Sequence, residues 1–237
     1  MTRPGREASV LLALASAAGF IDAVTYLGLG RVFTANMTGN TVLLGVAAAE
    51  RSSSDVLRAL VALGGFCLGG AAGMAWTGDR NGSWAWLTRW VFALETLALA
   101  ALLAVWQSAG AGSLRLLLVA LSGVAMGAQS AAVRISNVPG VNTTYMTSTL
   151  LNALAVVVPG ARQHRGDSRL PGAALGIYAL GAVAGAFAEK AWQAAAVAVP
   201  LAIVTTVTVV TFRWTRRDRP TDGGGRPQPQ PGGRSPD

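Results

Sequence analysis

The sequence predicts an all-α membrane protein, a helical bundle of two related halves with about six full transmembrane helices and two short, broken motif helices. Of its 237 residues, 52% are apolar and only 13% are charged, whereas soluble domains carry about 25% charged residues. Apolar stretches close to twenty residues recur along the chain, the length that a helix needs to cross ~30 Å of hydrocarbon. The tryptophans lie near the ends of these stretches, as an interfacial aromatic belt predicts.

Eight apolar segments divide the chain, and most of them are long enough to cross a bilayer. Their limits are Val10–Gly30, Phe33–Ala49, Val56–Trp76, Trp84–Trp106, Ser113–Arg134, Val141–Val158, Pro171–Ala188 and Trp192–Trp214. The second and sixth are short, because only 42–49 and, apart from Asn152, 150–158 are apolar. We therefore expect a transmembrane domain over residues 1–212 and a disordered, basic cytoplasmic tail over 213–237, which is rich in Pro, Gly and Arg.

The second and sixth segments each begin with a run of hydroxyl and amide side chains, 34–41 and 143–149. Hydrocarbon offers no hydrogen bonds, so polar groups at this depth need protein or water partners. Short polar breaks at matching places in two halves of a membrane protein indicate a transporter's binding site. The bland alternative is that the threonines bond to carbonyl groups of their own helices. The expected site residues are Asn36, Thr38, Asn40, Thr41, Thr144, Tyr145 and Thr147.

The four segments before residue 107 resemble the four that follow, which predicts an internal repeat over 10–106 and 113–212. Gly19 and Asp22 correspond to Gly127 and Ser130 at a separation of 108, and the threonines of the polar runs correspond at 109. The third and seventh segments both carry glycines four residues apart, a spacing that allows close helix contacts in lipid. Four crossings per half would make the repeats parallel, and three would invert them; the sequence leaves both open.

Two acids fall within apolar segments. Asp22 lies on a small and polar helix face with Ala18, Gly19 and Thr25, which should pack against protein. An acid at the centre of a span costs about 3 kcal/mol, so it commonly marks an ion path or a proton relay, although it can also be a structural acceptor. Glu95 has apolar helical neighbours and is either a second titratable site or a neutral helix contact. We expect Asp22, and secondly Glu95, to serve in coupling.

The net charge of +8 does not indicate a nucleic-acid partner, because no basic face with interleaved aromatic residues accompanies it. In either crossing scheme most of the Lys and Arg lie on one side, which predicts that both termini are cytoplasmic. One cysteine and one histidine leave no disulfide and no metal cluster to expect, and no cofactor is expected. No nucleophile–base pair is visible, so we do not expect an enzyme.

Four motifs, in order, resemble the YoaK family of predicted bacterial multi-pass membrane proteins. They are 19–24 (GFIDAV), 36–41 (NMTGNT), 126–131 (MGAQSA) and 143–147 (TTYMT), and the resemblance covers about residues 8–212. Ser130 and Ser148 depart from the family pattern, which more often has Asn and Gly. The resemblance implies a location in the inner membrane and about six spans, but no substrate or reaction.

The sequence thus favours a secondary transporter or channel for a small solute or ion, with proton coupling through Asp22 as one form of the mechanism. Asp22, Gln129 and Ser130 join the residues of the polar runs as the expected substrate site. The expected partners are the lipid bilayer, an unidentified small solute or ion, and a second copy of the chain through glycine-rich helix faces. The alternative is a membrane scaffold or accessory subunit whose polar motifs bind a partner protein.

Overall fold

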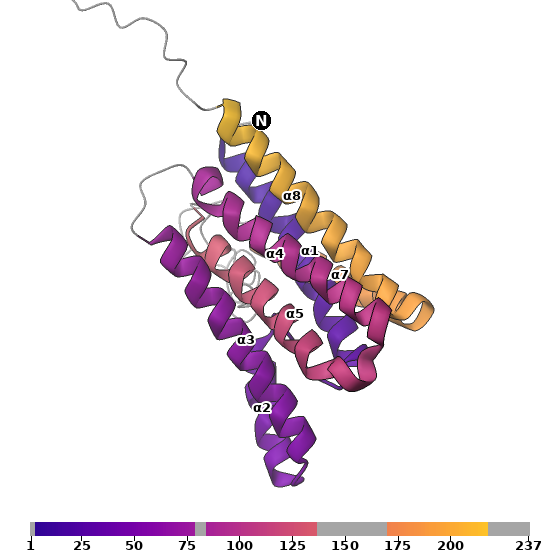
Figure 1. Cartoon of the computed structure of the whole chain (residues 1–237). Helices are drawn as coiled ribbons and strands as arrows, with labels where there is room; N and C mark the ends of the chain where they lie inside the picture. Colours follow the sequence, from indigo (N-terminus) through magenta and orange to yellow (C-terminus); the bar gives the residue numbers. More distant parts are fainter. Residues whose placement is uncertain (1–2, 79–83, 137–169, 218–237) are drawn as a thin grey trace, which may run out of the picture.

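The computed structural model describes residues 3–78, 84–136 and 170–217, and every regular element within these ranges is a helix (Figure 1). In chain order the elements are α1 (Arg3–Gly28), α2 (Met37–Ala49), α3 (Ser53–Thr77), α4 (Trp84–Ala109), α5 (Ala111–Arg134), α7 (Leu170–Trp192), the short 3₁₀ helix η1 (Gln193–Val197) and α8 (Ala198–Arg217). The all-helical class is confirmed. The second polar run and the predicted sixth segment lie outside the described residues.

Five stretches of the described helices are long and apolar enough to cross a membrane: Gly5–Gly28, Ser53–Thr77, Trp84–Ala109, Leu114–Arg134 and Leu170–Thr215. The last one has 46 residues and contains α7, η1 and α8. A straight helix of that length would measure about 70 Å, more than twice the hydrocarbon thickness, but the chain turns at η1. With 13 residues, α2 is only about 20 Å long. The chain is therefore a multi-pass membrane protein, and α2 is shorter than the α-helices that surround it in the described ranges.

Helices α1 and α7 run in the same direction and touch through glycines. A Cβ atom added to Gly181 would lie 2.3 Å from the carbonyl oxygen of Ser16, and one added to Gly185 would lie 2.4 Å from that of Phe20. Gly19 of α1 is equally tight against the backbone of α7. Only residues without a Cβ allow two helix backbones to approach this closely. Residue numbers rise together along both helices, so the pair is parallel.

Helices α3 and α5 form a second parallel pair of the same kind. A Cβ added to Gly65 would lie 2.8 Å from the carbonyl oxygen of Ala120, and one added to Gly69 would lie 2.1 Å from that of Val124. Gly127 of α5 is equally tight against the backbone of α3. Four of the glycines that the sequence placed four apart on the third and seventh segments thus make helix contacts within the chain, namely Gly65, Gly69, Gly181 and Gly185.

Helix α4 packs against α5 and α8, and it runs opposite to both. The Trp84 indole N–H at the start of α4 donates to the carbonyl oxygen of Ala132 at the end of α5 (2.9 Å). Farther along, the Thr96 and Thr208 hydroxyls are hydrogen-bonded at 3.0 Å. On the other side of α8, the Arg6 guanidinium of α1 lies over the Trp214 ring. Together these contacts make α1, α4 and α7 parallel to one another and opposite to α3, α5 and α8 (Figure 1).

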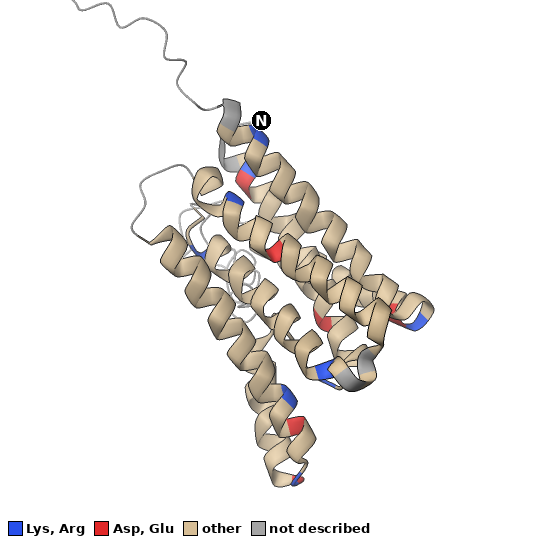
Figure 2. Cartoon of the chain, in the orientation of Figure 1, with Lys and Arg blue, Asp and Glu red and all other residues tan. Residues whose placement is uncertain are grey.

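The helix directions divide the charged residues between the two ends of the bundle, and Figure 2 shows mostly uncharged ribbon between them. The first turns of α1 and the last turns of α5 and α8 share one end, which therefore carries Arg6, Arg134 and Arg213. The turns between α2 and α3 and between α4 and α5 lie at the other end, with Arg51 and Arg115.

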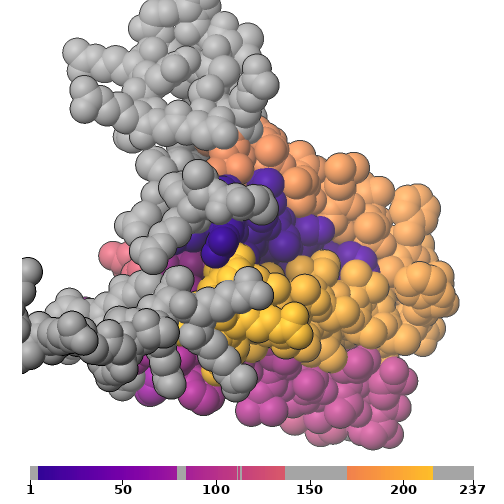
Figure 3. Space-filling view, turned by 90° about the horizontal axis from the view of Figure 1, so that it is seen from above, coloured from indigo at the N-terminus to yellow at the C-terminus, as the bar shows by residue number. Residues whose placement is uncertain are grey.

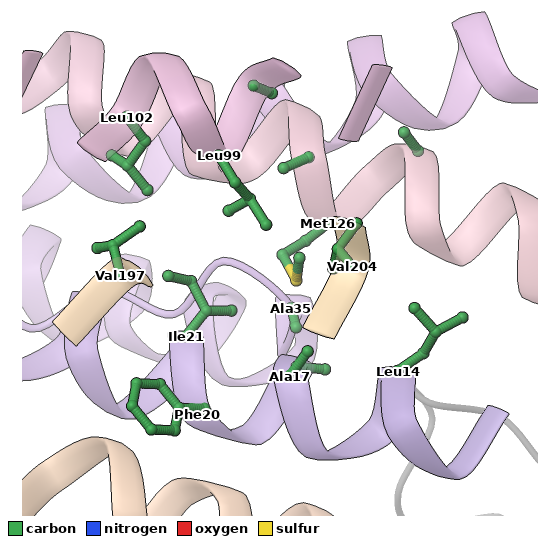
Figure 4. Close-up of a cluster of buried hydrophobic side chains, with 14 of the residues drawn as sticks. Leu14, Ala17, Phe20, Ile21, Ala35, Leu99, Leu102, Met126, Val197 and Val204 are labelled. Carbon is green, nitrogen blue, oxygen red and sulfur yellow. The ribbon is translucent and has the colours of Figure 1, made fainter. Parts of the chain in front are cut away.

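Helix α1 is surrounded by protein on most sides. Viewed from the end that carries the N-terminus, it lies between α7 and α8, with α4 beyond α8 (Figure 3). The sequence predicted protein contacts for its small and polar face, and Ala18 and Thr25 on that face are fully buried. Larger side chains off that face, Ile21 and Val24, are also fully buried. They join residues of α4, α5 and α8 in one apolar cluster (Figure 4).

Candidate functional site: a carboxylate clamp at a broken helix

The chain breaks its helical path between α1 and α2. Helix α1 ends at Gly28 and α2 begins at Met37. Gly30 (φ 96°) and Arg31 (φ 58°) adopt left-handed conformations, and the Arg31 N–H donates to the carbonyl oxygen of Tyr26. This bond and a left-handed glycine are the usual way to end a helix and redirect the chain. The first polar run thus begins in a non-helical segment, as a broken-helix motif requires.

Asp22 holds this segment in place. One carboxylate oxygen accepts hydrogen bonds from the backbone N–H groups of Thr34 and Ala35, both at 2.7 Å. The other accepts from the N–H of Asn36 (3.0 Å) and from the Tyr178 hydroxyl of α7 (2.7 Å). Asp22 is 2% exposed, so these four donors replace the water that its carboxylate would otherwise bind. We call Asp22 with these four donors the carboxylate clamp.

The clamp also supplies what the start of α2 needs. The first N–H groups of a helix lack partners within the helix, and they favour negative charge. Asn36 caps α2, because its side-chain oxygen accepts from the N–H of Gly39 (3.1 Å). The Asp22 carboxylate satisfies the three N–H groups just before the helix, from a different element. A polar helix start is thereby stabilised inside an apolar bundle.

Asn40 secures the other side of the break. Its side-chain oxygen accepts from the Phe33 N–H (2.9 Å), and its amide N–H donates to the Phe33 carbonyl oxygen (2.5 Å). The Phe33 ring stacks on Tyr26 with centroids 5.0 Å apart. The sequence expected Asn40 at the site, and in the structure Asn40 holds the start of the break at Phe33 while Asn36 caps α2.

The remaining expected site residues divide into two groups. Gln129 is fully buried and donates to the carbonyl oxygen of Leu14 (3.3 Å), which ties α5 to α1. Thr38 and Thr41 are exposed on α2, and the Thr41 hydroxyl donates within its own helix. Ser130 also donates within its own helix, to Met126. The hydroxyl groups of Thr41 and Ser130 thus bond to carbonyl groups of their own helices, as in the alternative to a binding site.

The expected residues Thr144, Tyr145 and Thr147 lie outside the described residues. Glu95 lies elsewhere, on the buried face of α4, where neither carboxylate oxygen has a hydrogen-bond partner among the described residues. The clamp and Glu95 are thus two different kinds of buried acid.

Sequence reasoning missed two members of this region. Tyr178, which donates to Asp22, lies 156 residues away, and nothing in its spacing connects it to an acid. Ser122 of α5 donates to the Thr34 hydroxyl (2.8 Å) and so fixes the same segment from a third helix. The only sequence signal for Tyr178 is a phenol among the small and apolar residues that make up α7 before Glu189.

Two hollows lie beside α2. One, of about 120 Å³, is lined by Gly30, Arg31, Val32, Leu43, Val46, Ala47, Glu50, Asp55 and Ala59. The other is an open groove of about 510 Å³ lined by Ala47, Ala48, Arg51, Ser53, Val56, Leu57 and Leu60. Both lie toward the end of the bundle opposite the N-terminus, and the smaller one is lined in part by Gly30, Arg31 and Val32 of the break.

Comparison with known proteins places this chain among relatives. Residues 10–210 match the family described as Protein of unknown function (DUF1275). The chain belongs to this family. It is similar to the UPF0700 transmembrane protein YoaK of Bacillus subtilis (strain 168), with 29% identity over 211 residues that cover 86% of this chain and 93% of the relative. The resemblance to the YoaK family is therefore confirmed. No solved structure matches.

Proposed function

We propose that this protein is a secondary carrier for a small solute or ion, built from two related halves of opposite orientation. One observation carries the proposal: the two parallel helix pairs make the same contacts at constant separations along the sequence. Gly19 touches Tyr178, and Gly127 touches Phe66. The two glycines are 108 residues apart in the sequence, and the two aromatic residues are 112 residues apart. In both contacts a Cβ on the glycine would lie 2.1 Å from the carbonyl oxygen of the aromatic residue.

The reciprocal contacts obey the same two separations. Gly69 against Val124 corresponds to Gly181 against Ser16, with clearances of 2.1 and 2.3 Å for an added Cβ. Helices α1 and α7 run in the opposite direction to α5 and α3. Superposing the α1–α7 pair on the α5–α3 pair therefore reverses its direction across the membrane. Each half then has three long helices: α1, α3 and α4 in the first, and α5, α7 and α8 in the second. Inverted repeats of this kind are characteristic of secondary transporters.

The non-helical segment between α1 and α2, which Asp22 holds in place, supports a substrate path through the two inverted halves. Carriers with inverted repeats bind their substrates where helices are interrupted, because backbone polar groups are free there. We propose that the segment from Gly30 to Asn36 lines the path, with Asn36 and Thr38 as side-chain contacts and Asp22 as the group that holds the segment. The residues of the second polar run are proposed to complete the site from the other half.

The proposal includes the orientation in the membrane. The end that carries the N-terminus also carries Arg134, Arg213 and the start of the basic tail, which supports a cytoplasmic location for both termini in the inner membrane. Five Lys and Arg would then face outward, namely Arg31, Arg51, Arg58, Arg115 and Lys190.

The experiment is reconstitution of the purified chain into vesicles, with uptake measured for a panel of metabolites and ions. We expect at least one solute to accumulate against the protein-free control, and we expect Asp22→Asn to abolish that flux. An Asp22→Asn variant that transports as well as wild type would remove Asp22 from the mechanism. If folded wild-type protein moves none of the solutes, the result favours the alternative of a membrane scaffold. The partner-binding surface of such a scaffold would include Gly64 and Gly176, where an added Cβ meets no neighbouring atom.

A further inference from the structure

Glu95 lies in the interior of the bundle without the partners that a buried carboxylate needs. It is fully buried on the face of α4 that also carries Phe92 and Leu99. Neither of its oxygens has a hydrogen-bond partner in the part of the chain that the structure describes. Buried polar groups in proteins are nearly always hydrogen-bonded, and an unpaired buried charge is far more costly than an unpaired neutral group.

A second unpaired oxygen points to the same region. The side-chain oxygen of Gln129 on α5 is also buried without a partner among the described residues. Leu99 of α4 and Met126 of α5 lie in one cluster (Figure 4), and Glu95 and Gln129 each lie about one turn from them. Glu95 precedes Leu99 along α4, and Gln129 follows Met126 along α5. Because α4 and α5 are antiparallel, Glu95 and Gln129 are displaced from the cluster toward the same end of the bundle. The two helices thus place unpaired side-chain oxygens in one stretch of the core, and these oxygens need a donor.

The charged groups on neighbouring elements do not meet this need. Among the described side chains of the elements that pack on α4, the charges lie in the first two or last two turns of their helices. They are Asp55 and Arg58 in α3, Arg115 and Arg134 in α5, and Arg213 in α8. Asp22 is occupied by its four donors.

We infer that Glu95 is the proton-binding site of this carrier, whereas Asp22 is a fixed positioning residue. A proton on one Glu95 oxygen neutralises the buried charge and gives the group an O–H that can donate to an acceptor such as the Gln129 oxygen. In each cycle the proton would come from water on one side of the membrane, form this O–H bond, and return to water on the other side. The assignment of the proton to a carrier cycle rests on the proposed function; the protonation of Glu95 does not.

The test uses dicyclohexylcarbodiimide on the wild-type protein in membranes, followed by peptide mass spectrometry. This reagent adds to protonated carboxyl groups in apolar surroundings and leaves an N-acylurea on the residue. We expect Glu95 to be modified and Asp22 and Asp55 to remain unmodified. Labelling of Glu95 should fall about tenfold per pH unit once most of the sites have lost their proton. Glu189, which is also buried, is resolved as a separate peptide.

Variants sharpen the result without being needed for it. Glu95→Gln should lose the adduct, and Asp22→Asn should retain it at Glu95. Modification of Asp22 in place of Glu95, or no adduct at Glu95 at any pH, would overturn the assignment. If the amount of Glu95 adduct does not change with pH, the proton on Glu95 is permanently bound. That result would overturn the proposed exchange of this proton with water. Because labelling needs no substrate, a positive result with no solute flux separates this inference from the carrier proposal.

Discussion

At the scale of single residues, two buried acids in one bundle meet the same cost by different means. Moving a carboxylate to the centre of a span costs about 3 kcal/mol. Asp22 offsets it with four hydrogen bonds, each of which contributes about 1.5–3 kcal/mol when one partner is charged. Glu95 has no such bonds among the described residues. The two acids therefore differ in their surroundings and not in their chemistry, which is why we propose different roles for them.

Asp22→Asn should destabilise the folded protein by about 3 kcal/mol, because the amide carries no charge and turns a donor toward groups that are themselves donors. The measurement is the free energy of unfolding in mixed detergent micelles, or the shift in Tm. Asp55→Asn is the control, since Asp55 lies in an exposed turn and pairs with Arg58. Equal stability of the Asp22→Asn variant and wild type would contradict the clamp.

Tyr178→Phe removes only one of the four donors and leaves the ring in place. We expect a loss of about 1–2 kcal/mol, smaller than that of Asp22→Asn, because three N–H groups still satisfy the carboxylate. In a double-mutant cycle the two changes should be less than additive, since both act on one hydrogen bond. Full additivity would show that the phenol acts elsewhere.

At the scale of the helices, glycine contacts determine which pairs form. Gly127→Ala should cost about 1–3 kcal/mol, because the new Cβ would lie 2.1 Å from the carbonyl oxygen of Phe66 and α3 and α5 would have to separate. Gly64→Ala is the matched control, since an added Cβ there meets no atom within 4 Å. Unfolding in detergent measures both. The explanation fails if the two variants lose the same stability.

How far the sequence predicts these elements depends on how local their causes are. Apolar runs and tryptophan positions predict the long helices, and the polar run at Thr34 predicts a break before α2, because both signals act along the chain. Burial of Asp22 follows from the small residues around it. Its partner Tyr178 is beyond such reasoning, because only the packing of α7 on α1 brings the two together. The burial of Ile21 and Val24 likewise depends on how many helices surround α1.

At the scale of the whole molecule, the arrangement of helix directions makes a topology prediction that the charge pattern alone could not. Single cysteines at Ser54 and Ser108, in a Cys67→Ser background, should react with an impermeant maleimide added outside intact cells. A cysteine at Arg213 should react only after the membrane is opened. Both serines lie at the end opposite the N-terminus. With eight crossings, all three positions would share the cytoplasmic side, and none would react from outside.

The central position of α1 has a consequence for biosynthesis. This helix leaves the ribosome well before two of its principal neighbours, α7 and α8, are made. Until they arrive, α1 must reside in the translocon or bilayer with an acid in its second half. The three backbone donors lie only 12 to 14 residues downstream of Asp22, so they emerge almost at once. The nascent chain thereby shields its own charge early, and the phenol of Tyr178 completes the shield once α7 has been made.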